Sequence, residues 1–265
     1  MPGAPGAVFG ARLPAEMPAA PPWRSAWIGH APFAFWIVAV LRPRVLVELG
    51  VHHGYSYCCF CEEVRRAGLP TRCFGVDTWQ GEAHAGHYGA EVLAALRAHH
   101  DPLYAGFSEL LPMTFDAAAA RFAPGSIDLL HIDGFHTEAA VRHDFETWRP
   151  LLSPNAVVLF HDIDERRDDF GVWKLWEQVS AGRPHFALHH QHGLGVLGMG
   201  SDYPPPLAAL FAATGAEAQA IRAGFEALGA HVAARYALQR RLDEAVEPRG
   251  LARQVMRAAR RFRSR

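Results

Sequence analysis

Five short apolar segments that alternate with helix-like segments constrain the fold of this 265-residue chain more than any other feature. The apolar residues within each segment are continuous, which is typical of strands covered on both faces. Strands that alternate with helices along a chain form a parallel sheet. The sequence therefore predicts a doubly wound, mostly parallel α/β fold with helices on both faces. The five segments are RVLVELG (44–50), RCFGVDTW (72–79), PLYAGFS (102–108), SIDLLHID (126–133) and AVVLFHDID (156–164).

Changes in composition divide the chain into three parts. Residues 1–22 are rich in Pro, Gly and Ala, which predicts a flexible N-terminal arm. Residues 23–203 hold the alternating strands and helices, and a helical C-terminal extension is expected over 204–265. From Arg249 this extension carries arginine and no acidic residue. The basic tail is expected to be an amphipathic helix that binds a membrane or a partner enzyme, or a solvated end.

The bulk composition narrows the class of protein. A net charge of −1 provides no general attraction to nucleic acid, so no such partner is expected. The sequence has neither the pattern of a secretory signal nor an apolar stretch long enough to span a bilayer. We expect a cytoplasmic protein, peripheral at the inner membrane face if the basic tail binds lipid. Buried, reduced thiols are predicted for the four cysteines, which stand among apolar residues without CxxC spacing: Cys58, Cys59, Cys61 and Cys73.

Polar residues and glycines collect where the predicted strands end. In open α/β sheets, ligands bind at the carboxyl ends of the strands, near the point where the strand order reverses. The sequence therefore predicts a ligand site at this edge of the sheet. Its candidate residues, in chain order, are Glu48, Gly50, Gly54, Asp77, Ser108, Asp133, His136, His161 and Asp162.

The turn after the first strand, Gly50-Val-His-His-Gly54, lets the backbone come close to a ligand before the next helix begins. It lacks the G-x-G-x-x-G pattern of dinucleotide oxidoreductases. Glu48 precedes the turn, and an acidic side chain there disfavours a diphosphate and suits a ligand with a cationic amine. Asp77, at the end of the second strand, is expected either to accept the hydroxyls of a ribose or to cap its turn.

Four segments occur in the order found in the class I S-adenosylmethionine-dependent methyltransferases, which the chain resembles from about Trp23 to Gly200. More narrowly, it resembles the metal-dependent O-methyltransferases of sugars and small molecules that are found with glycosyltransferases. The resemblance implies a Rossmann-like methyltransferase sheet and S-adenosylmethionine as the cofactor. The four segments are VELGVHHGYS, FGVDTW, HIDGFHTEAAVRHDFETW and VVLFHDIDERRDDFGVWKLW.

The resemblance also assigns cofactor contacts by position. It implies that Gly50 and Gly54 border the methionine moiety and that Asp77 holds the ribose hydroxyls. Ser108, in GFSEL, takes the position that contacts the adenine in that group. The remaining expected cofactor contacts are Glu48 and Asp133.

A divalent metal site is expected between the last two of these strands. Asp133 ends the fourth strand, and His161 and Asp162 end the fifth, so that neighbouring parallel strands bring them together. Two carboxylates and an imidazole can hold a hard cation that keeps open positions for substrate. The methyltransferases that the chain resembles bind Mg²⁺ there, typically with an acid-acid or acid-amide pair on the fifth strand. His161 departs from that pattern and could favour Mn²⁺ or Fe²⁺.

His136 is the predicted catalytic base. It follows Asp133 by three residues, in the loop after the strand, and can reach a hydroxyl bound at the same metal. The ordinary pKa of histidine suits proton removal near neutral pH. The resemblance places a base at this D-x-x-H position. The alternative is that His136 caps the following helix beside Thr137.

These expectations combine into a metal-assisted O-methyltransferase that methylates a sugar hydroxyl of a glycan or glycoside. One alternative is an aromatic or antibiotic small molecule as the acceptor. Another is a non-catalytic cofactor-binding subunit of a glycan-assembly complex. Expected partners are the acceptor, a glycosyltransferase or membrane surface at the basic tail, and a second copy of the chain.

Overall fold

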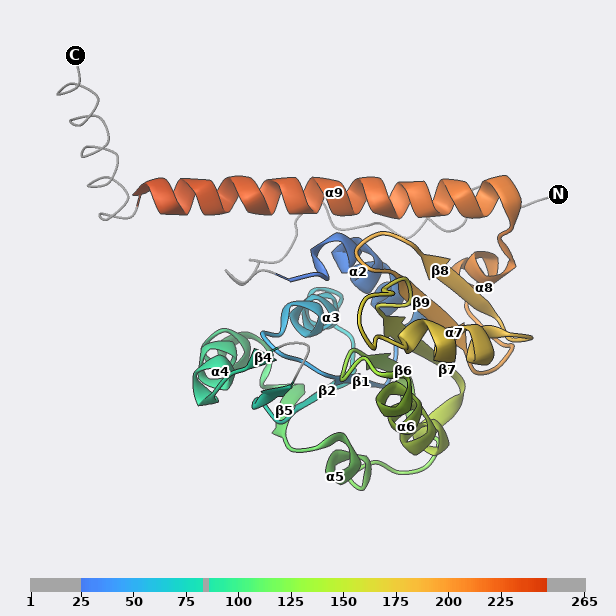
Figure 1. Cartoon of the computed structure of the whole chain (residues 1–265), viewed down its shortest axis with the longest axis horizontal. Coiled ribbons are helices and arrows are strands. Elements are labelled where there is room, and N and C mark those ends of the chain that lie inside the picture. The colour runs from blue at the N-terminus through green and yellow to red at the C-terminus, as the bar shows by residue number, and fades with distance from the viewer. Residues whose placement is uncertain (1–24, 83–85, 247–265) are drawn as a thin grey trace, which may run out of the picture.

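The computed structural model describes residues 25–82 and 86–246 (Figure 1). The predicted arm (1–22) and the basic tail that begins at Arg249 lie outside the described residues. Within the described part, no helix is long and apolar enough to cross a membrane.

A seven-stranded sheet forms the centre of the fold, and its first five strands are parallel. The last two strands continue the sheet in antiparallel pairing. The strand order reverses between β1 and β6, which lie side by side although the chain visits β2 and β5 between them. This sheet confirms the predicted doubly wound, mostly parallel fold. In spatial order the strands are β5 (Ser108–Pro112), β2 (Arg72–Asp77), β1 (Val45–Leu49), β6 (Ile127–Ile132), β7 (Leu152–His161), β9 (Leu194–Gly198) and β8 (His185–Leu188).

Alternate strand residues face two separate apolar layers, because successive side chains of a strand point to opposite faces. On β1, Leu46 packs into one layer and Val47 into the other, and both are fully buried. The four cysteines are free and buried in the first layer, as predicted. The first layer contains α2 (Ala31–Leu41), α3 (Tyr55–Arg66), α4 (Ala90–Tyr104), α8 (Pro205–Ala212) and α9 (Gly215–Val246), and the second contains α5 (Phe115–Ala119), α6 (Glu138–Trp148) and α7 (Val172–Ser180).

Short elements connect these layers. The 3₁₀ helix η1 (Ile28–His30) leads into α2, and η2 (Arg149–Leu151) joins α6 to β7. The strands β3 (Gly81–Glu82) and β4 (Gly86–His87) pair as a small separate hairpin after β2.

The predicted third strand is wrong in register. Residues 102–104 belong to α4, which contains Pro102 near its end, and the strand begins only at Ser108. Two leucines after Ser108 explain this register, because Leu110 packs into the first apolar layer and Leu111 into the second. Burial on both faces therefore selects residues 108–112 as the strand, and Ser108 lies at its start rather than at its end.

The helical C-terminal extension is present, and its helices join the core of the domain. Leu207 on α8 and Ile221 on α9 are fully buried in the first apolar layer. The ring of Phe225 contacts the rings of Phe33 and Trp36 on α2, at centroid distances of 5.3 and 5.9 Å. Figure 1 shows α9 running along one side of the molecule, over α2. The extension therefore packs on the outer side of α2.

Candidate active site

The glycine turn after β1 brings two strand ends into direct backbone contact. Gly50 has φ +90° and Gly54 has φ +85°, a region that favours glycine. A side chain at Gly50 would overlap the carbonyl oxygen of Asp133, at the end of the neighbouring β6. Gly54 then forms the N-cap of α3. Both glycines line the cavity described below, as the sequence predicts.

Asp77 holds the loops after β1 and β2 together. Its Oδ2 accepts a hydrogen bond from the backbone N–H of His52 at 2.8 Å, and its Oδ1 accepts one from that of Trp79 at 2.7 Å. The capping role, one of the two alternatives, is therefore present. Asp77 also lines the cavity, so its contact with a ribose stays a prediction.

A cavity of about 520 Å³ lies at the carboxyl ends of the parallel strands. Its size falls within the range that holds a small molecule or cofactor. Its position is the edge at which the strand order reverses, where the sequence places the site. The residues that line it include Trp27, Gly50, Gly54, Asp77, Thr114, Phe115, Asp133, Phe135, His136, His161, Asp162, Arg167, Phe170 and His192.

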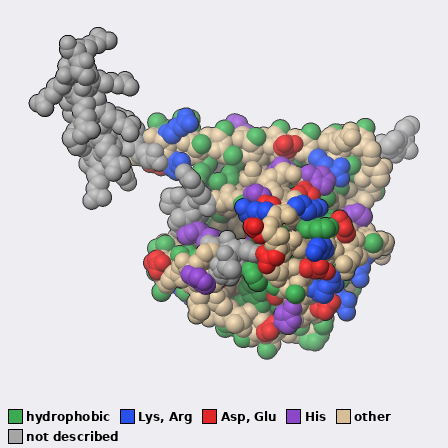
Figure 2. Space-filling model, in the orientation of Figure 1, with side chains coloured by type: hydrophobic (Ala, Val, Ile, Leu, Met, Phe, Trp, Pro, Cys, Tyr) green, Lys and Arg blue, Asp and Glu red, His purple; other side chains and the backbone are tan. Residues whose placement is uncertain are grey.

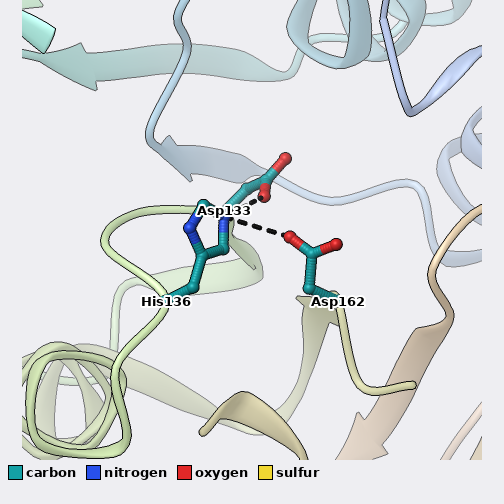
Figure 3. Close-up of side chains that lie close together, drawn as sticks. All are labelled: Asp133, His136 and Asp162. Atoms are coloured by element: carbon teal, nitrogen blue, oxygen red, sulfur yellow. Dashed lines mark ion pairs between the residues drawn. The ribbon is translucent and has the colours of Figure 1, made fainter. Parts of the chain in front are cut away.

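Two carboxylates and one imidazole meet in this cavity (Figure 3). The ligand atoms of Asp133, His136 and Asp162 all lie within 4.8 Å of one another. Nε2 of His136 is 3.0 Å from Oδ2 of Asp162 and 3.7 Å from Oδ1 of Asp133. Asp162 follows β7 with φ +61°, a left-handed conformation that is rare for a residue other than glycine. The donor set of two carboxylates and one imidazole suits a divalent cation.

His161, which was predicted as a metal ligand, lies beside the two carboxylates but outside this group of three. Its Nδ1 is 3.2 Å from Oδ1 of Asp133 and 3.3 Å from Oδ2 of Asp162. Its Nε2 is 3.1 Å from the carbonyl oxygen of Gln191. His161 therefore pairs with the same two carboxylates as His136, and its role as a metal ligand stays a prediction.

The two histidines balance the charge of the two carboxylates. Burial opposes ionisation of Asp133 and Asp162, but the charge of His161 and hydrogen bonds from His136 and His161 outweigh it. The pKa of Asp133 is thereby held well below its usual value, and that of Asp162 falls to about 2. Burial likewise disfavours the charged histidines, yet the carboxylates raise the pKa of His136 to about 9 and that of His161 well above its usual value. A divalent cation bound by the two carboxylates would supply the positive charge that the histidines now carry, and the histidines would then release their protons.

The loop after β7 holds His136 in place. The imidazole stacks on the phenyl ring of Phe170, with centroids 4.7 Å apart and planes 12° from parallel. The backbone N–H of Gly171 donates to the carbonyl of His136 at 2.8 Å, and Thr137 and Phe170 form an isolated β-bridge. The alternative role of His136 as a helix cap is wrong, because Thr137 is the N-cap of α6 and its side chain accepts from the N–H of Ala140.

Glu48 is not among the residues that line the cavity. It is fully buried, and its Oε1 accepts a hydrogen bond from Ser56 at 2.6 Å. Its Oε2 lies 3.2 Å from Nδ1 of His131. Burial raises the pKa of Glu48, and the charge of His131 opposes this. The expected contact with a cationic ligand is therefore replaced by internal pairing on neighbouring strands.

Ser108 also lies away from the cavity, contrary to the expected adenine contact. It pairs with Cys73 at the start of β2, whereas Asp77 at the end of β2 pairs with Pro112. The two ends are separated by the length of the strand. The Ser108 hydroxyl instead lies 2.6 Å from the Tyr57 hydroxyl and 2.7 Å from Nε2 of His100, within the buried layer.

Sequence reasoning missed several cavity residues. Thr114 and Phe115 follow the true end of β5, so the correct strand register would have found them. Arg167 and Phe170 stand in the loop after β7, in a segment identified only by resemblance. Trp27 comes from the N-terminal side of the domain, where no strand end marks it.

Comparisons with known proteins agree with this architecture. Residues 47–163 match the family described as "Methyltransferase domain". The uncharacterized protein y4gI of Sinorhizobium fredii (strain NBRC 101917 / NGR234) is 50% identical over 186 residues, which are 70% of this chain and 20% of that protein. The chain therefore spans about a fifth of the length of this relative. The family match confirms the predicted resemblance to methyltransferases, whereas the branch found with glycosyltransferases stays a prediction.

Solved structures show a likeness in fold. Cofactor-bound Rv0187 from MTB is 18% identical, with a TM-score of 0.50 over 73% of this chain and 86% of that one. A "putative caffeoyl-CoA O-methyltransferase" from Staphylococcus aureus is 12% identical, with a TM-score of 0.50 over 64% of this chain and 82% of that one.

Proposed function

We propose that this chain, whose residues 47–163 match a methyltransferase-domain family, is an S-adenosylmethionine-dependent O-methyltransferase that uses a divalent metal ion. The observation that carries the proposal is the cluster of Asp133, His136 and Asp162 on the wall of one cavity with the glycine turn and Asp77. A methyl donor and an acceptor hydroxyl would share this cavity.

The donor side of the cavity is formed by the turn after β1 and the end of β2. Gly50 and Gly54 leave the backbone without side chains where the turn enters α3. The carboxylate of Asp77 has both oxygens fixed by backbone N–H groups. Each oxygen keeps a further lone pair that can accept a ribose hydroxyl.

Asp133 and Asp162 would hold the metal ion. Their pKa values are held low by the neighbouring histidines, so both carboxylates are ionised at neutral pH and ready to coordinate. When bound, a divalent cation lowers the pKa of a coordinated hydroxyl and of an adjacent imidazole. Mg²⁺ is the ion that the two hard carboxylates favour, and Mn²⁺ also binds carboxylate oxygens.

His136 would accept the proton of the acceptor hydroxyl at Nε2. As the hydroxyl oxygen bonds to the methyl carbon, the bond between that carbon and sulfur breaks, so the products are a methyl ether and S-adenosylhomocysteine. Such a displacement depends on close approach and alignment. The stack on Phe170 and the hydrogen bond from Gly171 to the His136 carbonyl supply that alignment for the base.

A sugar hydroxyl is the proposed acceptor group. Phenyl rings of Phe115, Phe135 and Phe170 line the cavity together with polar groups of Arg167 and His192, a mixture that suits the apolar faces and polar edges of a sugar. An aromatic diol fits the same lining and remains the second candidate. As the resemblance in sequence implies, we also propose that the acceptor sugar belongs to a glycan or glycoside and that the chain associates with a glycosyltransferase.

The test combines binding and turnover. Isothermal titration with S-adenosylhomocysteine should show binding to wild-type protein, and methyl transfer to a panel of monosaccharides, glycosides and catechols should stop on addition of EDTA and resume with Mg²⁺ or Mn²⁺. His136→Ala should reduce kcat by about 10² to 10⁴-fold and leave the affinity for Mn²⁺ within threefold or so. Absence of S-adenosylhomocysteine binding would refute the donor assignment. A loss of Mn²⁺ affinity in His136→Ala would make His136 a ligand rather than the base.

A further inference from the structure

From Leu228 onward, α9 carries an exposed face that the methyltransferase chemistry does not use. Leu228, Leu238 and Leu242 are 37%, 58% and 52% exposed. Among the described residues only one other large hydrophobic side chain, Leu103, is exposed to a similar degree. Three of the four exposed large hydrophobic side chains of this part of the chain therefore lie on one helix.

These leucines share their face with basic groups. Residues 228, 231, 235, 238 and 242 follow the spacing i, i+3, i+7, i+10 and i+14, which aligns them along one side of a helix. His231 and Arg235 complete this row, Arg241 lies beside it, and all three are exposed. We name Leu228, His231, Arg235, Leu238, Arg241 and Leu242 the basic-leucine face.

The basic-leucine face borders the side of α9 that packs on the domain, and Leu238 and Leu242 lie beyond Val232, the last buried residue described in this helix. Ile221, Phe225 and Val232 are buried, and they belong to the row that faces α2. Figure 2 shows arginine and hydrophobic side chains on the end of α9 that extends past the rest of the fold.

The sequence beyond α9 carries charge of the same sign. Residues 249–265 contain seven arginines and no acidic residue, although the whole chain has a net charge of only −1. Asp243, Glu244 and Glu247 stand between Leu242 and this segment, but residues 228–265 together hold ten arginines and only three acidic residues. Two such faces on two copies of the chain would repel each other, so charge complementarity favours an anionic occupant over a second copy.

We propose that the basic-leucine face binds the surface of an anionic lipid bilayer. A helix with apolar side chains on one face and arginines beside them lies in the plane of the interface, with its leucines inserted among the lipid headgroups. Arginines near such a surface add attraction that weakens as salt screens it. The carboxyl-end cavity is built from other elements, so lipid binding and methyl transfer are separate properties of the chain.

Sedimentation of the full chain with vesicles tests the proposal. Wild-type protein should sediment with vesicles of phosphatidylcholine and phosphatidylglycerol in equal parts, remain in solution with phosphatidylcholine alone, and be released by salt. The variant Leu238→Ser/Leu242→Ser should bind at least about tenfold more weakly. Arg235→Gln/Arg241→Gln should also bind more weakly and show a smaller response to salt.

Matched controls come from elsewhere on the surface. Leu103→Ser removes an exposed leucine from α4, and Arg183→Gln removes an exposed arginine before β8; both should sediment as wild type. Circular dichroism checks that each variant folds. Equal binding of Leu238→Ser/Leu242→Ser and wild type would overturn the proposal that α9 binds the bilayer, and it would assign lipid binding to residues 249–265 instead. Failure of wild-type protein to sediment with phosphatidylglycerol vesicles, including the case in which it elutes as a dimer instead, would overturn the proposal.

Discussion

The phenyl ring of Phe170 stacks on the imidazole of His136, with ring centroids 4.7 Å apart and planes 12° from parallel. The two residues come from loops after different strands, β6 and β7, and a β-bridge beside the stack joins those loops. Phe170 therefore fixes the direction in which Nε2 of His136 points, toward Asp162 at 3.0 Å.

Replacing Phe170 by leucine should lower kcat by about 10 to 100-fold, because an imidazole without its stacking partner leaves the productive orientation. KM for the acceptor should change much less. Phe170→Tyr keeps the stack and should restore most of the activity. Phe122→Leu, which removes a similar ring that packs on Trp148 away from the cavity, is the control. Nitrogen NMR signals of the His136 ring should shift in Phe170→Leu alone; unchanged signals and kcat would contradict the positioning role.

Asp162→Asn should weaken Mn²⁺ binding by more than about 100-fold, beyond the usual effect of groups that merely orient ligands. The reason is the loss of one of the two carboxylates that would hold the ion. Electron paramagnetic resonance of Mn²⁺ measures the bound fraction directly. Asp202→Asn, an exposed substitution outside the cavity, should bind as wild type. Wild-type affinity in Asp162→Asn would exclude Asp162 as a ligand.

Gly50→Ala should cost about 2 kcal/mol or more of the free energy of unfolding. Its φ of +90° disfavours alanine, and the added methyl group would overlap the carbonyl oxygen of Asp133. Gly106→Ala is the matched control, because an added methyl group there meets no heavy atom within 4 Å. The control should stay within about 0.5 kcal/mol of wild type in urea denaturation. Equal stability of the two variants would show that β1 and β6 tolerate a wider separation.

Asp144 predicts a dependence of stability on pH. Burial raises the pKa of its carboxyl to about 7, opposed by His143 and assisted by Asp116. The folded protein therefore holds this proton up to a higher pH than the unfolded chain does. Stability should fall as pH rises from about 4 to 7, by up to about 4 kcal/mol, and the penalty should stay complete above pH 7.

Asp144→Asn removes this ionisation and should raise Tm at pH 8 with little effect at pH 4. Denaturation of both proteins across this range measures the difference. A stability difference that is the same at pH 4 and pH 8 would contradict the raised pKa of Asp144.

The sequence was sufficient to predict the sheet and the residues at the centre of the candidate site, because strand ends are visible as apolar runs that stop at polar residues. Asp133, His136 and Asp162 were found this way, since the ends of neighbouring parallel strands must meet. Asp77 and the two glycines were found from their place after β2 and β1. Each of these positions is local in the sequence.

The errors arose where a residue's role depends on partners that are distant in sequence. Ser108 was misplaced because α4 continues through Pro102, and only burial of Leu110 and Leu111 on opposite faces decides where β5 begins. Glu48 was expected to face a ligand, but its partner His131 lies on the adjacent strand. The metal-binding role of His161 stays a prediction, and its second nitrogen lies beside the carbonyl of Gln191, a partner in the loop between β8 and β9 that the sequence does not reveal.

The cavity is completed by residues on both sides of the segment that matches the methyltransferase family. Trp27 precedes residues 47–163, whereas Arg167, Phe170 and His192 follow them. Under the proposed function, the donor is held by the matched segment, and the wall nearest the acceptor comes largely from outside it. Acceptor preference can therefore diverge between relatives while the matched segment is preserved, and exchange of the 165–170 and 189–193 loops between two such enzymes is a direct route to a new acceptor.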